Sequence, residues 1–527
     1  MPIFKRLKEK RSKRVLLVTP TSPHDIGTTK WMSPNLGIER LAGYLNSNGH
    51  YAETYDTNLH KAVGGEPSLE NKIKDTAWDV IGFSVYEETM PMDIENMMLA
   101  SRIQPDALII AGGHSAQFDY MTILDKSPAR LVVLGEGEKP LLKLVNGEPL
   151  EEIPGIVLKN YNEPLTPEEF KHATESIDYE RIPYEKYWNY YIDLFNKTGR
   201  EISDELSQQI HTIRIYTRNY CPMGCKFCSS TNFLPKGCGK PVRIADVSGQ
   251  DLLLLIKRII KAHPRVETIY FTDDDFCSHR NKLIEFLQLL NTAKLPVTFI
   301  SFARIDDLDE EVVSLMVAAG FRTLNIGIES FQPEILKEYN KKLDPAVIGK
   351  QIALLNSYGM HPAVTFILCS PESRIEWIED TAKRVLEELD KGTIHPGVNA
   401  TVQPQKGSRF WEEYVEMETQ LLHIPGTEHT IKREHFIKCT DPEVREFQYR
   451  LLYRWTNHID RVSREESGGH LNSQTQSAMK LKIILDVIKE IKSERGSPDQ
   501  TKYTNMSLEE KNKLWLTLQK YSYGASL

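Results

Sequence analysis

Short apolar runs alternate with amphipathic stretches along the first third of the chain. The runs are apolar on both faces and rich in β-branched residues, a pattern typical of strands buried in a parallel sheet. Residues 36–49, LGIERLAGYLNSNG, have helical periodicity and end at a glycine, which predicts a helix. Residues 14–148 are therefore predicted to form a doubly wound, Rossmann-like α/β domain. The five expected strands are residues 14–20, 51–57, 79–85, 107–113 and 130–136.

A second alternation begins near residue 206, after a stretch without sustained periodicity. That stretch, residues 149–205, is rich in proline, acidic residues and tyrosine, and we expect a partly ordered linker there. Six βα units then follow in succession and predict a partial (β/α)6 TIM-like barrel over residues 206–425. The six expected barrel strands are residues 212–217, 268–272, 297–302, 323–328, 363–368 and 397–402.

Length, charge and composition narrow the class of protein. A chain of 527 residues is long enough for several domains, and residues 426–527 are predicted to be a helical C-terminal region. The longest aliphatic run, residues 252–256, is far too short to span a bilayer, so no transmembrane segment is expected. The net charge of −8 argues against a nucleic-acid partner, and we interpret the basic residues 1–13 as a solvated N-terminal arm. An odd number of cysteines and no apolar signal-peptide core after Met1 indicate a cytoplasmic location.

Three of the seven cysteines lie within the eight residues CPMGCKFC, in the loop after the first barrel strand. In barrels of this kind, the loops at the carboxyl ends of the strands carry the chemistry. Cys221, Cys225 and Cys228 could hold three irons of a cubane iron–sulfur cluster and leave the fourth iron without a protein ligand. A zinc site is the alternative, with Cys238 or a distant histidine as fourth ligand, but no second pair of ligands with zinc spacing is present. The spacing favours the cluster.

The pattern CxxxCxxC, with an aromatic residue before the last cysteine and a strand before the loop, resembles the radical S-adenosylmethionine (SAM) superfamily. The order of motifs in the first domain, such as WDVIGFSVYEET and LIIAGGHSAQF, resembles the class that carries a cobalamin (B12)-binding domain before the barrel. The resemblance implies a [4Fe-4S] cluster whose open iron is chelated by SAM. It also implies cleavage of SAM by one electron to methionine and a 5′-deoxyadenosyl radical.

The resemblance also implies a set of SAM-binding residues in the loops after the second, third and fourth barrel strands. The segments YFTDDDF, ISFARID and GFRTLNIGIESF match these elements, and a zwitterionic ligand needs both an acid and a guanidinium within reach. Asp275 and Asp306, in the same segments, are interpreted as ordinary residues of the barrel rim. The residues expected to bind SAM are Asp273, Asp274, Arg304, Glu329 and Ser330.

Two further cysteines are candidate catalytic residues. The chain has ILCSPES after the fifth barrel strand, where the family commonly shows a glycine-rich turn, so Cys369 stands on the predicted catalytic rim. Cys277 follows the second strand. The alternative for both is that a lone cysteine serves as a small apolar filler.

Cobalamin is expected at the carboxyl end of the first sheet, where such sheets bind ligands. Ser84, Gly112 and Gly113 lie there, and paired glycines let the backbone approach a ligand closely. The segment SPHDIG keeps the histidine and glycine of the family's DxHxxG pattern but has Ser22 in place of the aspartate. His24 is therefore a candidate cobalt ligand, and the alternative is a cobalt without a protein ligand.

The sequence predicts a cobalamin-dependent radical SAM methyltransferase that acts on an unactivated carbon or phosphorus centre. Its cofactors would be the [4Fe-4S] cluster, SAM and cobalamin, and its partners a small-molecule or peptide substrate and a reducing protein such as flavodoxin or ferredoxin. One alternative is a radical cyclisation, rearrangement or oxidation in which the first domain has another role. Another is a non-catalytic metal-binding protein. The loops expected to contact the substrate have an unspecific composition and do not identify it.

Overall fold

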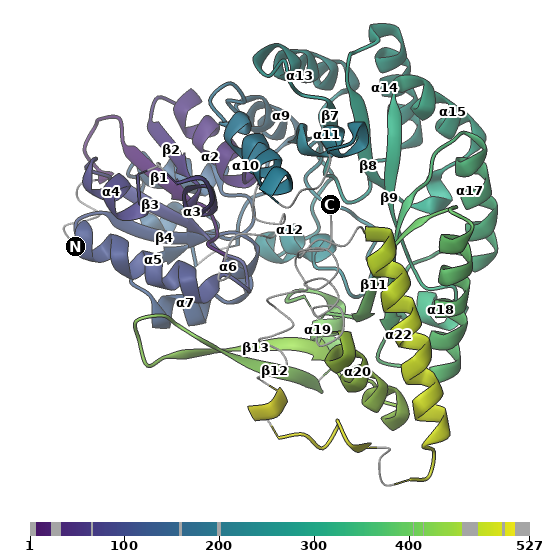
Figure 1. Cartoon of the computed structure of the whole chain (residues 1–527). Coiled ribbons are helices and arrows are strands. Elements are labelled where there is room, and N and C mark those ends of the chain that lie inside the picture. The colour runs from purple at the N-terminus through teal and green to yellow at the C-terminus, as the bar shows by residue number, and fades with distance from the viewer. Residues whose placement is uncertain are drawn as a thin grey trace.

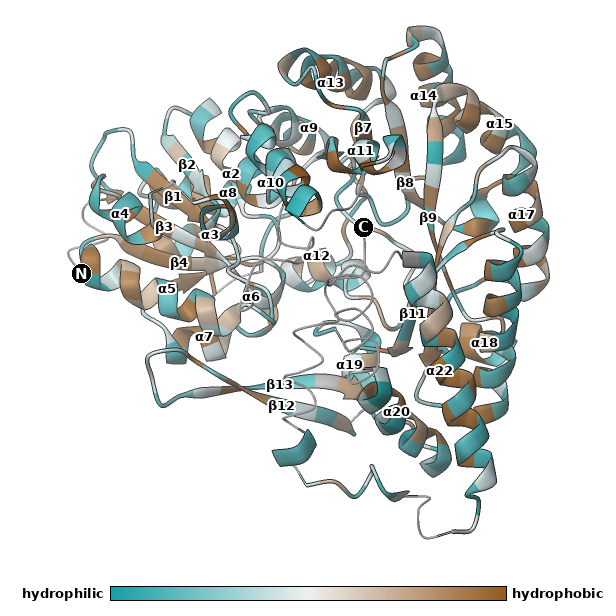
Figure 2. Ribbon diagram, viewed as in Figure 1, coloured by the Kyte–Doolittle hydropathy of each residue, from teal (hydrophilic) through white to brown (hydrophobic). Residues whose placement is uncertain are grey.

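A computed structural model describes residues 7–22, 33–64, 67–157, 161–197, 202–403, 405–414, 416–455, 473–497, 501–507 and 509–511. Two α/β units lie side by side, the first at the left of Figure 1 and the second at the right. Hydrophobic residues gather on their strands and on the faces of the helices that cover them (Figure 2). None of the described helices is long and apolar enough to cross a bilayer.

The first unit is a parallel five-stranded sheet in the order β2-β1-β3-β4-β5. This is a doubly wound topology, in which ligands bind at the carboxyl ends of the strands near the point where the order reverses. The fold class predicted for this unit and its five strands are confirmed. The strands are β1 (Arg14–Val18), β2 (Tyr51–Tyr55), β3 (Val80–Ser84), β4 (Leu108–Gly112) and β5 (Leu131–Val132). The helices are α2 (Leu36–Ser47), α3 (Thr57–Val63), α4 (Leu69–Lys74), α5 (Met90–Ile103), α6 (His114–Phe118), α7 (Tyr120–Lys126) and α8 (Glu138–Val145).

The second unit is a parallel six-stranded sheet in the order β11-β10-β9-β8-β7-β6. The sheet curves but ends at β6 on one side and β11 on the other, so it is the open barrel that the sequence predicts. The strands are β6 (Thr212–Ile215), β7 (Thr268–Phe271), β8 (Thr298–Ala303), β9 (Phe321–Glu329), β10 (Ala363–Cys369) and β11 (His395–Thr401). The helices are α12 (Ser230–Cys238), α13 (Gly249–Ala262), α14 (Arg280–Ala293), α15 (Glu310–Ala319), α16 (Pro333–Glu338), α17 (Pro345–Ser357) and α18 (Ile375–Asp390).

The stretch expected to be a partly ordered linker contains three helices, α9 (Pro167–Glu175), α10 (Tyr184–Lys197) and α11 (Asp204–Ile210). The side chains that α10 buries are Tyr184, Tyr187, Trp188, Tyr191 and Phe195. Their spacing is that of one helical face, but the face is made of aromatic residues, which are weak helix formers, and the periodicity is easily overlooked. The helix connects the two units. Trp188 packs edge-on against His211 of the barrel, and the hydroxyl of Tyr187 donates to Asp56 of the first domain at 2.6 Å.

Residues 426–527 are not entirely helical, which corrects that prediction: they contain β13 (Thr430–Ile437) as well as α20 (Pro442–Arg454) and α22 (Ser473–Ser493). β13 forms an antiparallel hairpin with β12 (Met417–His423), which lies, like α19 (Arg409–Glu413), in the last part of the range predicted for the barrel. The sequence of these two strands does not alternate between apolar and polar residues, because their buried positions include the polar residues Glu418, Gln420 and Arg433. The hairpin reaches back beneath the first domain (Figure 1), where Ile424 and Ile431 join that domain's core.

The N-terminal arm is also more ordered than predicted over its described part. The Arg11 guanidinium donates to the buried carboxylate of Asp79, with an Nη1–Oδ2 distance of 2.9 Å, and Lys13 is fully buried. Leu7 and Lys13 are therefore packed on the first domain, whereas residues 8–12 between them are exposed, as predicted for a solvated arm. The local sequence does not reveal the contact between Arg11 and Asp79.

We expect Gly43 in α2 to be intolerant of any side chain. A Cβ at this position would overlap the backbone carbonyl of Ser176, which follows α9. Gly43→Ala should therefore destabilise the protein by about 1–3 kcal/mol, because the backbone must move apart. The measurement is the midpoint of thermal unfolding.

Gly349 in α17 provides the matched control, because no atom lies within 4 Å of the position that its Cβ would occupy. Gly349→Ala should be neutral or stabilising by up to about 1 kcal/mol, the helix propensity of alanine over glycine. Equal midpoints of thermal unfolding for the two variants would contradict the close packing of α2 against Ser176.

Candidate functional site

The carboxyl ends of the two sheets border one cavity of about 470 Å³. The first domain contributes Ser84, Gly112 and Gly113, three residues that the sequence places at a cobalamin site. The barrel contributes Asp274, which the sequence places at a SAM site. Two sites predicted from separate motifs therefore adjoin. The other barrel residues that line the cavity are Tyr216, Asn219, Tyr220, Ser230, Phe233, Leu234 and Thr272.

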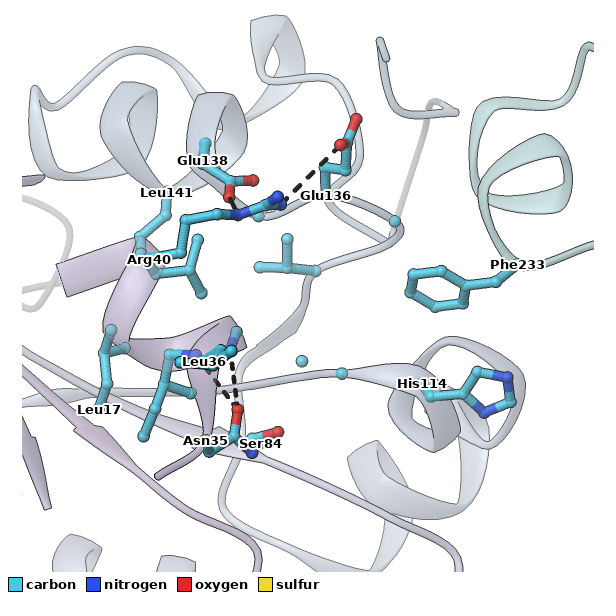
Figure 3. Close-up of a pocket in the computed structure, with 18 of the residues that line it drawn as sticks. Leu17, Asn35, Leu36, Arg40, Ser84, His114, Glu136, Glu138, Leu141 and Phe233 are labelled. Atoms are coloured by element: carbon cyan, nitrogen blue, oxygen red, sulfur yellow. Dashed lines mark hydrogen bonds and ion pairs between the residues drawn. The ribbon is translucent and has the colours of Figure 1, made fainter. Parts of the chain in front are cut away.

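A slot of this cavity runs along the first sheet, beneath α2 and α8 (Figure 3). Its floor is Gly82 of β3, flanked by Leu17 and Ile110 on the neighbouring strands. A Cβ on Gly82 would lie 2.9 Å from Cδ2 of Leu17, so the glycine keeps the slot open. At the mouth, Gly113 has a φ of +95°, which favours glycine and brings the backbone to the cavity wall. The slot fits the tail of a large cofactor.

Charged side chains on the cavity wall neutralise one another. The Arg40 guanidinium of α2 pairs with Glu138, with an Nε–Oε1 distance of 2.6 Å, and lies 3.9 Å from Glu136 (Figure 3). It also stacks over Phe170 of α9 and Tyr216 of the barrel, at 5.3 and 5.6 Å from the ring centroids. Burial raises the pKa of Glu136 to about 7. Arg40 of α2 therefore contacts α8, α9 and the barrel at the edge of the cavity.

His114 is a cavity residue that sequence reasoning did not single out. It begins α6, directly after Gly113, and stacks on Phe233 of α12 with ring centroids 5.3 Å apart. Burial lowers its pKa to about 4, so the imidazole is neutral near pH 7. Its Nε2 atom is buried without a hydrogen-bond partner among the described residues. In the sequence, only the position of His114 directly after the paired glycines Gly112 and Gly113 points to a place at the cavity.

The loop of three cysteines is held from both sides. The Thr231 hydroxyl donates to the carbonyl of Cys221 at 3.0 Å, and the amide of Cys228 donates to the carbonyl of Cys225 at 3.2 Å. Gly224 has a φ of +77°, and its carbonyl accepts from the Asn340 side chain at 2.8 Å. The three cysteines are half-buried and free. They therefore lie in one fixed loop at the carboxyl end of β6.

Protonation of these thiols depends on what they bind. Burial raises the pKa of Cys221 to about 12 and also raises that of Cys228. Without a cation the two residues are therefore neutral thiols near pH 7, and iron would be needed to hold them as thiolates. Phe227 packs edge-on against Tyr339, with ring centroids 5.1 Å apart, and covers one side of the loop. The donor set fits a cluster that supplies several cationic irons.

Over the described residues, no three histidine, cysteine, aspartate or glutamate side chains converge closely enough to hold a single metal ion. A cubane cluster is wider than one ion, and its ligands need not converge in that way. Cys238, the possible fourth ligand of a zinc site, packs instead with Leu234 and Val242 in an apolar cluster.

Asp273 and Asp274 have different surroundings although they are adjacent. Asp273 is buried and accepts from the amide and the hydroxyl of Thr217, at 2.9 and 2.6 Å, so it joins the end of β6 to β7. Burial raises its pKa to about 6. Asp274 instead lines the cavity with an accessible side chain, next to Ser230 at the start of α12. Of the two, only Asp274 has a carboxylate that faces the cavity.

The remaining predicted SAM residues form a buried polar group. The Glu329 carboxylate pairs with Lys341, with an Oε1–Nζ distance of 3.1 Å, and its backbone has a φ of +69°, a strained conformation for a residue other than glycine. Arg304 donates through Nη2 to Asp306 at 2.8 Å and to the carbonyl of Lys341 at 2.9 Å. The hydroxyl of Ser330 accepts from the amide of Gln332 at 3.1 Å. Lys341 is a site residue that sequence reasoning missed.

Asp275 differs from the ordinary rim residue that the sequence indicated. It is buried, and no donor of the described residues reaches either carboxylate oxygen, so its hydrogen bond to the Asp307 carboxyl needs a proton on one of the two groups. Burial and the neighbouring Asp307 carboxyl raise the pKa of Asp275 to about 7. The Nε atom of Arg304 is also buried without a partner within the described part of the chain. Buried polar atoms are rarely left unsatisfied, and the ammonium and carboxylate of a zwitterionic ligand have complementary charges.

Cys277 and Cys369 are both buried in the hydrophobic core. Neither of them lines the cavity. Cys369 has Cys439 as a neighbour, whose thiol donates to the carbonyl of Ser370 at 3.1 Å. Their surroundings favour the role of small apolar fillers. His24, the candidate cobalt ligand, lies outside the described residues.

Comparison with known proteins agrees with this arrangement. Residues 26–145 match the model of the B12 binding domain, and residues 215–385 match that of the radical SAM superfamily. The chain is 24% identical over 446 residues to the uncharacterized methyltransferase PH0819 of Pyrococcus horikoshii. The aligned region covers 80% of this chain and 88% of the relative. It is 25% identical over 388 residues to the anaerobic magnesium-protoporphyrin IX monomethyl ester cyclase of Rubrivivax gelatinosus, covering 70% and 65%.

Among solved structures, the chain resembles the cobalamin-dependent SAM radical enzyme OxsB with aqua-cobalamin and SAM bound. The TM-score is 0.62 at 15% identity, and the match covers 99% of this chain and 85% of the other. At this identity the likeness shows the fold, with the two domains in the same order.

We expect replacement of any one cysteine of the loop to prevent cluster assembly. Cys225→Ala, in protein produced and reconstituted without oxygen, should lose most of its iron and acid-labile sulfide, because two ligands do not retain the cluster. Cys238→Ala is the control and should keep both, since Cys238 packs in an apolar cluster. Stoichiometric zinc without iron in the unmodified protein would contradict the cluster.

Proposed function

We propose that this chain, a member of the B12-binding-domain class of the radical SAM superfamily, is a cobalamin-dependent methyltransferase acting on an unactivated carbon or phosphorus centre. The observation that carries the proposal is the single cavity between the two domains, lined by Gly112 and Gly113 on one side and by Asp274 on the other. Such a cavity would let a methyl donor and a radical source reach one substrate. The relative from Pyrococcus horikoshii is named a methyltransferase, which supports the same activity.

We assign three binding regions to the cavity and its surroundings. When bound, the cluster and SAM would supply a 5′-deoxyadenosyl radical, and cobalamin would supply a methyl group. Cys221, Cys225 and Cys228 would hold the cluster at the carboxyl end of β6. The residues proposed to bind SAM are Asp274, Arg304, Glu329 and Ser330, with Asp275 added because no donor of the described residues reaches its buried carboxylate. The residues proposed to bind cobalamin are Ser84, Gly112 and Gly113, with His24 retained as a candidate cobalt ligand.

The chain's own residues would position these groups and exclude water. Asp273 holds Thr217 and so sets where the cysteine loop leaves β6. Phe227 and Tyr339 cover the loop on one side, and the ion pair of Glu329 with Lys341 holds a carboxylate at the end of β9. These contacts keep the groups in place without the ligands. Preorganised charges of this kind contribute to catalysis because they need no rearrangement during the reaction.

A second candidate is radical cyclisation or oxidation. The relative from Rubrivivax gelatinosus is named a cyclase and is about as similar to this chain as the methyltransferase. Both activities would use the cluster and SAM, and they differ in whether a methyl group is transferred. The products of SAM therefore distinguish them.

We further propose a small-molecule substrate, a cytoplasmic location and reduction by a flavodoxin or ferredoxin. A small-molecule substrate is supported by the match to the radical SAM family and by the volume of the cavity, about 470 Å³. The location and the reductant follow from the cluster, whose thiolates require a reducing compartment.

Methyl transfer predicts two products from SAM. Purified protein with cluster, cobalamin and a reductant should form both S-adenosylhomocysteine and 5′-deoxyadenosine, measured by mass spectrometry. Cys228→Ala should form no 5′-deoxyadenosine, because the cluster that passes the electron to SAM would be missing. If 5′-deoxyadenosine forms while S-adenosylhomocysteine stays at background in protein with cobalamin bound, the cyclase alternative is favoured.

Cobalamin binding should depend on the space above Gly82. Gly82→Val places two methyl groups in the slot between Leu17 and Ile110, and we expect the cobalamin retained per chain to fall at least tenfold. The visible absorption of protein reconstituted with cobalamin and desalted measures it. Gly397→Val on β11, whose Cβ would lie 3.6 Å from Thr365, tests a strand glycine outside the cavity and should bind normally. If Gly82→Val retained as much cobalamin as the unmodified protein, the cofactor would have to bind outside this slot.

A further inference from the structure

The inside of the barrel is accessible, unlike the packed interior of a closed barrel. Along the strands, alternate residues such as Ile213, Phe271 and Phe299 join the hydrophobic core shared with the outer helices. The residues between them point the other way, into the lumen, and several are exposed, on the edge strands β6 and β11 as well as on the central strands β8 and β10. Those exposed residues are Arg214 on β6, Phe302 on β8, Thr365 on β10, and Gly397 and Asn399 on β11.

One side of this lumen carries a cation above aromatic rings. Arg214 is paired with Tyr270 in the sheet register, and its Cζ lies 5.9 Å from the centroid of the Tyr270 ring. Tyr270 and Phe302 are in contact, with ring centroids 5.7 Å apart, and Phe302 is 38% exposed. The Asn325 amide donates to the Tyr270 hydroxyl at 3.0 Å, which fixes the ring. Together these four residues, here called the lumen site, offer a guanidinium, two aromatic faces and an amide.

The Arg214 guanidinium has no carboxylate within ion-pair distance among the described residues. Its Nη1 donates to the hydroxyl of Ser33, at 2.9 Å, just before α2. Most other arginines near the domain interface have acidic partners, as Arg40 does with Glu138 and Arg433 with Glu88. A guanidinium has five donors in a fixed fork, and one neutral hydroxyl leaves most of them available for an oxyanion.

The lumen site adjoins the cavity between the domains. Thr272, which directly follows β7 and lies two residues after Tyr270, lines that cavity. Asn35, two residues after Ser33, lines it as well. Two residues of strand span about 6.6 Å, so a small molecule can reach from Arg214 to the level of the cysteine loop.

Building on the proposed function, we propose that the lumen site binds the substrate, and that the substrate is an organic anion with an unsaturated or apolar body. Arg214 would bind its carboxylate or phosphate through paired hydrogen bonds, and Tyr270 and Phe302 would contact its body. The atom to be methylated would then face the cavity. The anchor lies at the far end of the molecule from the reacting centre, so it selects the substrate class without contributing to the chemistry.

The test compares two probes that differ only in charge, 1-naphthoate and 1-naphthamide. Their affinities for the cobalamin-loaded full chain are measured by isothermal titration calorimetry without SAM or reductant. The unmodified protein should prefer naphthoate, and Arg214→Gln should reduce that preference about tenfold or more, since a charge-assisted bond is lost. Arg181→Gln is the charge-matched control, because Arg181 is 80% exposed and pairs with Asp178. This variant should keep the preference.

Phe302→Ala separates the two parts of the site. It should weaken naphthoate and naphthamide by the same factor, because the aromatic contact does not depend on charge. The proposal is overturned if naphthoate shows no saturable binding, if the preference survives in Arg214→Gln, or if Arg181→Gln loses it equally. No turnover is involved, so these results stand apart from the SAM products that test methyl transfer.

Discussion

The position of α12 is the constraint on which the rest of the site depends. The helix begins two residues after Cys228 and packs at once against the first domain. The Gln117 side chain bridges the two units, donating to the carbonyl of Phe233 at 2.9 Å and accepting from the amide of Gly135 at 2.8 Å. Gly237 permits this approach, because a Cβ there would lie 2.6 Å from the Gln117 oxygen. The cysteine loop and the cavity wall are therefore parts of one rigid connection.

Segments distant in sequence hold the two units in the same relation. The aromatic face of α10 contacts both domains, and the hairpin of β12 and β13 buries Ile424 and Ile431 in the first core. Arg433 of the hairpin pairs with Glu88 at 3.3 Å, next to the carboxyl end of β3. A cavity between two domains keeps its shape only if the domains cannot move apart, and these contacts supply that restraint.

Buried charges are costly, and their placement here is consistent with a binding role. Arg40 with Glu138, and Lys341 with Glu329, are nearly buried pairs whose desolvation offsets much of their attraction. Such pairs add little net stability but fix side chains in direction. Asp275 has no cation paired with it over the described residues, and its neighbour is a second carboxyl group, Asp307. Arg214, in the lumen, is an exposed cation that donates to Ser33 and has no carboxylate within ion-pair distance over the described residues.

The sequence by itself determined the elements and the cluster loop, and the tertiary structure decided which residues meet. All eleven strands of the two sheets follow from local hydrophobic pattern, and the three cysteines follow from spacing, because both signals lie within a few neighbouring residues. The helical face of α10 and the hairpin were missed because aromatic and polar residues occupy their buried faces. Asp273 and Asp275 look alike in the run DDD, yet one accepts from Thr217 and the other lies against the carboxyl group of Asp307. The roles proposed for His114, Lys341 and Arg214 depend on Phe233, Glu329 and Ser33, which folding brings near them. No local pattern in the sequence encodes such tertiary contacts.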